Sequence, residues 1–329
     1  MEKIFIYSLS FQDEMCTNRL SSIFSYFNPL IFSYFIMNIA IIDPEVDASL
    51  IKKYLNKAHT LFEYDTRYDP KNIDALIIRS QTTVDKDLLN QYPALQYIFR
   101  VGVGTEKIDL KACKAREILV FNTPWANASA VAELAIWALL EAYRHPFTAI
   151  QDMKKQLIKE RTNYIGTELH THTIGFFGFG AVGKMIAKKL EGFDVQGMYY
   201  DPYVDGEYYH FTKEENKNTL FEVCDTIIIV APLFPETKHT INKDTLEICK
   251  ENVKILNMSR WWLVDETALL KFMKWHPQAF FFADVWEWEP KITDNLQTLF
   301  DLPNVLITNH IGSASQSAIE RMHYFELLR

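Results

Sequence analysis

The sequence predicts two α/β domains, each built on a doubly wound parallel sheet, from three observations. First, 329 residues exceed what one hydrophobic core usually fills. Second, short apolar runs alternate along the chain with helical patterns, as they do in βαβ units. Third, six of the only 11 glycines fall in three short loops, where we expect the backbone to have a special task. These glycines are Gly102, Gly104, Gly178, Gly180, Gly183 and Gly312.

The overall composition excludes several classes of protein. With 48% hydrophobic and 23% charged residues, the chain is neither collagen-like, a coiled coil nor wholly disordered. A net charge of −8 without basic runs disfavours nucleic-acid binding. The four cysteines are far apart, with no CxxC pair, so we expect neither a disulfide framework nor a bound metal. This pattern suits the reducing cytoplasm.

Residues 1–36 differ from the rest of the chain. They contain the pentapeptide IFSYF twice, at Ile23–Phe27 and Ile31–Phe35, separated by Asn28-Pro29-Leu30. The stretch lacks the basic start and cleavage site of a signal peptide, and Asn28-Pro29 interrupts any membrane span. We therefore expect a poorly ordered extension or translated sequence upstream of the true start. Met37, which precedes a clean strand, would be a natural first residue.

The first domain is expected from about residue 37. Its predicted strands are Ile39–Ile42, Ala75–Arg79, Tyr97–Val101 and Ile118–Phe121. A helix over Ala130–Tyr143 follows, and it is apolar on nearly every face, which predicts burial.

A second alternating series predicts a nucleotide-type domain that begins well inside the chain. Its six predicted strands are Thr173–Phe177, Gln196–Tyr200, Thr226–Val230, Val253–Asn257, Ala279–Asp284 and Asn304–Thr308.

The first of these strands runs directly into a G-x-G-x-x-G loop, Gly178 to Gly183, and then into a helical pattern. In this context the glycines predict a tight turn, a close approach to a pyrophosphate and close helix packing. Asp201 ends the next strand, 23 residues after Gly178. A carboxylate there accepts bonds from ribose hydroxyls and repels a 2′-phosphate, which favours NAD over NADP. The alternatives are a glycine turn without a ligand and a simple Asp201-Pro202 turn.

Three later segments place polar residues at strand ends: residues 257–266, 284–290 and 308–315. Ligands in open α/β sheets lie beyond the carboxyl ends of strands, so these segments can converge on one site. Arg260 would supply an anion anchor, His310 an acid/base and Glu289 a carboxylate that tunes it. The alternatives are a surface cation, a loop histidine and a solvated acid.

With these residues the chain, from about Met37 onward, resembles the D-isomer-specific 2-hydroxyacid dehydrogenase family, phosphoglycerate dehydrogenase-like members included. Arg260 and Glu289 match the family's spacing of 29 residues, which selects Glu289 over Glu287. The other matching motifs are Arg79–Val84, Val101–Gly104, Ile108–Leu110, Asn122–Pro124, Ala132-Glu133, the glycine loop and Pro232–Thr237.

The resemblance implies roles for individual residues. His310 would give a proton to the substrate carbonyl as hydride arrives from NADH, and Glu289 would pair with its imidazole. Arg260 would bind the substrate carboxylate, with backbone N–H groups around Val101 and Gly102 as a second cradle. The implied cofactor contacts are Thr82, Gly178, Gly180, Ala181, Val182, Gly183, Asp201, Pro232 and Asp284, the last toward the nicotinamide carboxamide.

The resemblance also implies an organisation. A flavodoxin-like substrate domain would comprise residues 37–132 and 309–329, and a Rossmann NAD-binding domain residues 133–308. The expected activity is hydride transfer between NAD(H) and a D-2-hydroxy acid/2-oxo acid pair of the phosphoglycerate, glycerate/hydroxypyruvate or glyoxylate type. A homodimer formed through the cofactor domain is expected, with neither a nucleic-acid nor a membrane partner.

Some positions depart from the family pattern. Trp261 and Trp125 replace glycines, Ala181 replaces a frequent arginine, and only 19 residues follow His310. If both indoles face the substrate, the site is smaller or more apolar; if they point away, they are packing. These departures keep an alternative open, a non-catalytic NAD(H)-binding protein similar to the family's corepressor branch, or a decayed paralogue.

Overall fold

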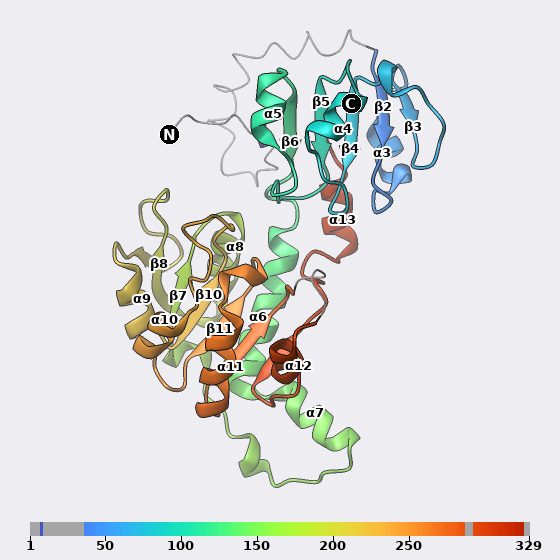
Figure 1. Cartoon of the computed structure of the whole chain (residues 1–329). Helices are drawn as coiled ribbons and strands as arrows, with labels where there is room; N and C mark the ends of the chain where they lie inside the picture. Colours follow the sequence, from blue (N-terminus) through green and yellow to red (C-terminus); the bar gives the residue numbers. More distant parts are fainter. Residues whose placement is uncertain (1–6, 9–35, 287–291, 326–329) are drawn as a thin grey trace. The chain divides into compact units, whose positions relative to one another are not determined.

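The computed structural model describes residues 7–8, 36–286 and 292–325. The chain forms two compact units (Figure 1). The N-terminal unit comprises the described residues up to Asn127 and those from Ser315 onward; the central unit runs from Ala128 to Ala314. Residues 309–314, expected in the substrate domain, belong to the central unit because Ile311 and Gly312 donate hydrogen bonds to Asp284 there.

The N-terminal unit contains a parallel sheet with the strand order β1-β6-β5-β4-β2-β3. Its strands are β1 (Tyr7–Ser8), β2 (Asn38–Ile41), β3 (Thr60–Phe62), β4 (Ala75–Ile78), β5 (Tyr97–Arg100) and β6 (Leu119–Asn122). Because β3 and β4 lie on opposite sides of β2, the winding direction reverses at β2, as the fold class requires.

Two residues of the expected N-terminal extension belong to this sheet. Tyr7 and Ser8 pair in parallel with Phe121 and Asn122 of β6. Backbone pairing places these two residues at the sheet edge, and the expectation of a poorly ordered extension otherwise stays a prediction. The repeated IFSYF segments lie outside the described residues.

Helices cover both faces of the N-terminal sheet. They are α3 (Ala48–Tyr54), α4 (Lys86–Gln91), α5 (Leu110–Ala115) and α13 (Gln316–Met322), with the 3₁₀ turn η1 (Pro70–Asn72). Ile51 and Met322 pack on one face with Phe99, and Leu89 and Cys113 pack on the other. Each α-helix begins at an aspartate or serine whose side chain accepts an N–H of the first turn, which satisfies donors that have no intrahelical partner.

His323 attaches the C-terminal helix α13 to the loop after β2. Its buried imidazole accepts a hydrogen bond from the Asp47 N–H at Nε2 (3.1 Å), which leaves Nδ1 as the donor to Ile319 O (2.7 Å). Burial holds the pKa of His323 below its usual value. The folded state therefore favours the neutral ring, because a protonated Nε2 cannot accept the bond.

We expect His323 to make stability fall in acid. Below the unfolded pKa of about 6.5, the unfolded chain binds a proton that the folded chain resists, so the free energy of unfolding decreases as pH drops. His323→Leu should lower stability at pH 8 by about 1–3 kcal/mol, because the Asp47 N–H loses its partner, and should flatten the acid dependence. Denaturant unfolding from pH 8 to pH 5 measures both; equal acid slopes for the two proteins would contradict the assignment.

The central unit contains a parallel sheet with the order β13-β12-β11-β10-β7-β8-β9. Its strands are β7 (Thr173–Phe177), β8 (Gln196–Tyr200), β9 (Phe211–Lys213), β10 (Thr226–Ile229), β11 (Lys254–Asn257), β12 (Phe280–Ala283) and β13 (Val305–Ile307). The strand order reverses at β7, which has β8 on one side and β10 on the other. The predicted fold class of two doubly wound parallel sheets is therefore confirmed.

Helices on both faces bury alternate residues of the central strands (Figure 1). Phe176 and Ile228 pack with α6 and α8, whereas Phe177 and Ile229 pack with α9 to α12. The helices are α6 (Ala128–Arg144), α7 (Pro146–Lys154), α8 (Ala181–Leu190), α9 (Lys217–Val223), α10 (Lys243–Ile248), α11 (Glu266–Trp275) and α12 (Asp294–Phe300). The 3₁₀ turns are η2 (Arg161–Tyr164), η3 (Leu169–Thr171), η4 (Glu191–Phe193) and η5 (Trp261–Leu263). Within the described parts of the chain, no helix has the length and apolar character to cross a membrane.

Candidate functional site

The loop between β7 and α8 has three glycines, and each is there for a different structural reason. Gly178 has φ +87°, and a Cβ there would lie 2.5 Å from the Ala231 backbone nitrogen, so no other residue fits this turn. Gly180 is the N-cap of α8, and a Cβ there would meet nothing within 4 Å. A Cβ on Gly183 would lie 3.2 Å from the Phe179 ring and 3.3 Å from Val230, so Gly183 serves packing.

The position of Gly180 fits a phosphate group. The first N–H groups of a helix have no intrahelical partner, and the aligned peptide dipoles make this end positive. Ala181 and Val182 form the first turn of α8, and the open space above Gly180 lets an anion approach the backbone. The residues present therefore fit the pyrophosphate of a dinucleotide.

Asp201 follows β8 and holds the glycine loop. Its Oδ2 accepts a hydrogen bond from Phe179 N (2.7 Å), and its Oδ1 accepts one from Tyr203 N (2.8 Å). The bond from Tyr203 N closes the simple Asp201-Pro202 turn that was the alternative interpretation. The bond from Phe179 N joins Asp201 to the glycine loop. Each oxygen retains a lone pair, so the carboxylate can still accept a hydroxyl.

Strand β10, which pairs with β7, brings Pro232 beside this loop. Val230 and Ala231 both donate N–H groups to Phe177 O, at 2.9 and 3.0 Å. Thr237 closes the turn that follows by donating to Pro232 O (2.7 Å) and accepting from Phe234 N (2.8 Å).

Arg260 lies beyond the carboxyl end of β11 on a constrained backbone. Asn257 donates from Nδ2 to Arg260 O (2.8 Å) and accepts Ser259 N at Oδ1 (3.1 Å). Ser259 Oγ in turn donates to Ala231 O, which joins this segment to the end of β10. The half-buried Arg260 donates from Nη1 to Ser259 O (2.9 Å), so its guanidinium is oriented by its own turn.

Trp261 packs into the central core and does not narrow the space at Arg260. Its side chain is 5% exposed and meets the Phe281 ring edge-on at 6.2 Å. Its Nε1–H donates to Glu266 Oε2 (3.3 Å). Of the two interpretations of this indole, the structure supports packing. Trp125, by contrast, is a partly exposed residue of the N-terminal unit.

Asp284 and His310 share one hydrogen-bonded loop at the ends of β12 and β13. The Asp284 carboxylate, 4% exposed, accepts Thr308 Oγ1 (2.7 Å) and Ile311 N (2.8 Å) at Oδ1 and Gly312 N (2.7 Å) at Oδ2. These donors flank His310, an exposed residue with φ +52°. A left-handed backbone is uncommon for residues other than glycine, and the bonds to Asp284 hold it there.

Four of the predicted residues therefore lie at the same edge of one sheet: Gly178, Arg260, Asp284 and His310 follow β7, β11, β12 and β13. Asp284, predicted to contact the nicotinamide, is found bonded to the His310 loop, with one lone pair of Oδ2 still unused by these bonds. Glu289 lies outside the described residues, so its pairing with His310 stays a prediction.

The predicted backbone cradle around Val101 and Gly102 stays a prediction, and these two N–H groups have partners of their own. Val101 N donates to Ile78 O (2.8 Å), and Gly102 N donates to Thr123 Oγ1 (3.0 Å), so both N–H groups are used inside the N-terminal unit. Gly102 has φ +120°, and a Cβ there would lie 1.9 Å from Arg100 Nη1. Arg100 was missed by the sequence analysis, although its place directly before Val101-Gly102 was visible.

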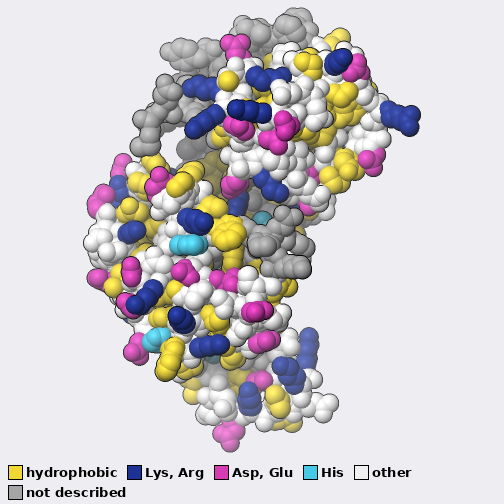
Figure 2. All heavy atoms as spheres, in the orientation of Figure 1, with side chains coloured by type: hydrophobic (Ala, Val, Ile, Leu, Met, Phe, Trp, Pro, Cys, Tyr) yellow, Lys and Arg dark blue, Asp and Glu magenta, His cyan; other side chains and the backbone are white. Residues whose placement is uncertain are grey.

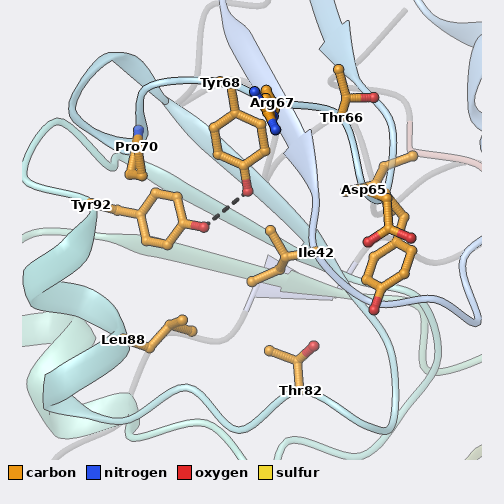
Figure 3. A pocket seen from close by; sticks show the side chains of 11 residues that line it. Ile42, Asp65, Thr66, Arg67, Tyr68, Pro70, Thr82, Leu88 and Tyr92 are labelled. Carbon is orange, nitrogen blue, oxygen red and sulfur yellow. Dashed lines mark hydrogen bonds between the residues drawn. The ribbon is translucent and has the colours of Figure 1, made fainter.

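Thr82 also belongs to the N-terminal unit. It lines an open pocket of about 590 Å³ beyond the ends of β2 and β4 (Figure 3). In this pocket the hydroxyls of Tyr68 and Tyr92 point toward each other, 3.0 Å apart, over Ile42. Across the described parts of the chain, no group of three or more His, Cys, Asp or Glu residues could hold a metal ion.

A doubly wound sheet with a glycine loop at the reversal point and a helix N-terminus above it defines a dinucleotide-binding domain of the Rossmann type. Residues 136–312 match the family model described as D-isomer specific 2-hydroxyacid dehydrogenase, NAD binding domain. The chain belongs to this family, which confirms the resemblance predicted from its motifs.

Individual relatives and solved structures are similar to this chain over most of its length. The D-3-phosphoglycerate dehydrogenase of Methanocaldococcus jannaschii is 33% identical over 251 residues, 75% of this chain and 47% of that protein. The chain spans about half the length of the curated relatives it matches. Among solved structures, D-lactate dehydrogenase from Aquifex aeolicus, complexed with NAD and lactic acid, has a TM-score of 0.76 at 25% identity, over 87% of this chain and 92% of that one. The NAD⁺-bound 3-phosphoglycerate dehydrogenase of Entamoeba histolytica has a TM-score of 0.72 at 25% identity, over 88% and 92%.

Proposed function

We propose that the protein is an NAD-dependent D-2-hydroxyacid dehydrogenase. It would reduce a 2-oxo acid to the D-2-hydroxy acid and catalyse the reverse oxidation. The observation that carries the proposal is the loop of His310, held by Asp284 at the same sheet edge as the glycine loop. A dinucleotide site and an acid–base side chain then belong to one rigid sheet. NADH would supply the hydride.

The side chains of the central unit have separate roles in this proposal. Arg260 binds the substrate carboxylate, since a guanidinium pairs with it through two parallel bonds. His310 donates a proton to the carbonyl oxygen, with Glu289 as its predicted partner. Asp201 accepts the ribose hydroxyls and repels a 2′-phosphate, which favours NAD.

The N-terminal unit carries its own predicted substrate contacts in the loop after β5. Because the Val101 and Gly102 N–H groups are donated internally, we assign the backbone cradle to the following residues, Val103 and Gly104. The Arg100 guanidinium, against Gly102, adds positive charge beside this loop. We propose substrates of the phosphoglycerate, glycerate/hydroxypyruvate or glyoxylate type, since curated relatives are named D-3-phosphoglycerate dehydrogenase.

The test is nicotinamide absorbance with NADH or NADPH against a panel of these 2-oxo acids. The proposal requires turnover with at least one acid and a preference for NADH. Tight NADH binding without turnover on any acid would instead favour the corepressor-like alternative. A preference for NADPH would contradict the role of Asp201.

We also propose a cytoplasmic location, in keeping with the free thiols. Cys113 and Cys224 are buried, and burial raises the pKa of their thiols to about 11 and about 12. Such thiols stay protonated and unreactive at neutral pH.

A homodimer formed through the central unit is the proposed assembly. Helix α7 and the segment after it extend away from the sheet of that unit (Figure 1). They expose apolar side chains, including Met153 at 63% and Ile158 at 86% exposure. Figure 2 shows hydrophobic side chains beside those of lysine or arginine on this protruding part. The other exposed apolar residues here are Phe147, Ile150, Leu157 and Ile165. Several large apolar side chains exposed on one segment are typical of an interface.

Replacing Met153 and Ile158 together with aspartate is expected to convert a dimer into a monomer, because two charges would be buried without partners. Light scattering after size-exclusion chromatography measures the mass. Trp275→Asp is the matched control, because this residue of α11 is 82% exposed but lies outside the α7 surface. The proposal fails if the wild-type chain is monomeric or if the double variant still dimerises.

A further inference from the structure

Two loops of the N-terminal unit meet at the reversal point of its sheet. Residues 43–45 follow β2 and residues 79–82 follow β4, and these strands pair in parallel, Ile41 beside Ile77. The second loop, Arg79-Ser80-Gln81-Thr82, carries the predicted cofactor contact Thr82. Nothing in its own sequence fixes the backbone of this loop, which has no helix or strand over these residues.

The buried Asp43 accepts several hydrogen bonds from that loop. Its side chain is 0% exposed, and its Oδ2 accepts the N–H groups of Arg79, Gln81 and Thr82, each at 3.0 Å. Thr82 Oγ1 also donates to Oδ2 (3.1 Å), while Oδ1 accepts Glu45 N (3.1 Å). A buried carboxylate is costly unless donors surround it, and here most of the donors come from one loop.

Glu45 holds the exposed side of the same loop. Its Oε1 accepts Gln81 Nε2 (3.2 Å), its Oε2 accepts the Ser80 hydroxyl, and its backbone oxygen accepts Arg79 Nη1 (3.0 Å). These groups are partly exposed to water, so their bonds stabilise the loop less than those of the buried Asp43.

We propose that Asp43 is a positioning residue, which fixes the backbone of residues 79–82 and the rotamer of Thr82 before ligands bind. Because the Thr82 hydroxyl proton points to Asp43, Thr82 offers a ligand its lone pairs and its methyl group. Asp43 itself touches neither substrate nor cofactor and acts through the loop. The inference rests on the proposed function for its kinetic consequence, but the fixed loop is a property of the free protein.

The first experiment measures the loop without any catalysis. In the full chain, Asp43→Asn keeps the shape of the side chain but removes its charge and one acceptor. We expect the amides of Arg79, Gln81 and Thr82 to exchange hydrogen about tenfold faster, because their charge-assisted bonds to Asp43 are lost. Asp69→Asn is the control, since the Asp69 side chain accepts a local bond from Lys71 N in the turn η1. Unchanged exchange at residues 79–82 in Asp43→Asn overturns the proposal.

The second experiment measures the kinetic consequence. We expect Asp43→Asn to lower kcat/KM by about 10- to 100-fold, because a small displacement of a positioning loop misaligns the reactants. A residue that only supported folding would leave the kinetic constants of the folded fraction unchanged. Kinetic constants within about twofold of wild type, in a folded variant, would overturn the inference.

If Asp43→Asn does not fold, Thr82 gives a second route. Thr82→Val preserves shape but loses the hydroxyl bond to Asp43, whereas Thr82→Ser keeps it. We expect the valine variant to lose more kcat/KM than the serine variant at equal melting temperature, and equal losses contradict the proposal. Failure of the proposed function is separate, since it would show as absent turnover in the wild-type protein.

Discussion

Replacement of His310 with glutamine is expected to lower the turnover of 2-oxo acid reduction by about 10²–10⁴-fold, while NADH binds as in the wild type. Glutamine can donate a hydrogen bond to the carbonyl oxygen but cannot transfer a proton at neutral pH. The backbone should remain in place, because Thr308, Ile311 and Gly312 bond to Asp284 independently of the imidazole. Steady-state kinetics and NADH fluorescence titration measure the two quantities.

His239 gives a matched control for this variant. It is a second histidine of the central unit with φ +52°, so His239→Gln makes the same chemical change on the same type of backbone. Its neighbours are the turn after Thr237 and the N-cap Asn242, to which no catalytic role is assigned. We expect His239→Gln to turn over normally. Unchanged turnover in His310→Gln, or equal losses in both variants, would remove His310 from the mechanism.

Most of the fold could be predicted because long buried strands carry a strong apolar signal. All six strands predicted for the central unit are present, two with the predicted bounds and four with ends that shift by one residue. The strands β1, β3 and β9 were not predicted; they have two or three residues each and lie at sheet edges. An edge strand this short has too few residues for a recognisable period, and its pairing depends on the neighbouring strand.

The candidate site could be predicted where the chemistry lies within one short segment. Gly178, Gly180 and Gly183 are such a case, since backbone conformation alone demands glycine at the first of them. Hydrogen-bond partners that are distant in sequence could not be predicted. Asp43 bonds Thr82 from 39 residues away, and Asp284 bonds Gly312 from 28 residues away.

Two details of the site depend on residues that lie elsewhere in the sequence. Whether Trp261 faces the substrate or the core depends on Phe281, a residue of the neighbouring strand β12. The N–H groups of Val101 and Gly102 are consumed by Ile78 and Thr123, which come from the strand before and the loop after. Such hydrogen-bond partners are set by tertiary structure, and a local motif does not reveal them.

Two glycine variants separate binding of the cofactor from stability of the loop. We expect Gly180→Ala to weaken NADH binding by about 10- to 100-fold, because a methyl group would occupy the space through which a pyrophosphate reaches the backbone. In the free protein this methyl meets nothing within 4 Å, and φ at Gly180 is −76°, so the melting temperature should fall little. The loss of an N-cap glycine costs at most about 1 kcal/mol.

Gly178→Ala should behave in the opposite way. Its Cβ would lie 2.5 Å from Ala231 N on a backbone of φ +87°, so strain and displacement of β10 should destabilise the free protein by about 1–3 kcal/mol. Gly192→Ala, in η4, is the control for both, since its Cβ also meets nothing within 4 Å. NADH titration and thermal unfolding of the three variants measure the pattern. If Gly180→Ala binds NADH as tightly as Gly192→Ala does, the phosphate does not approach α8 here, and the cofactor assignment fails with it.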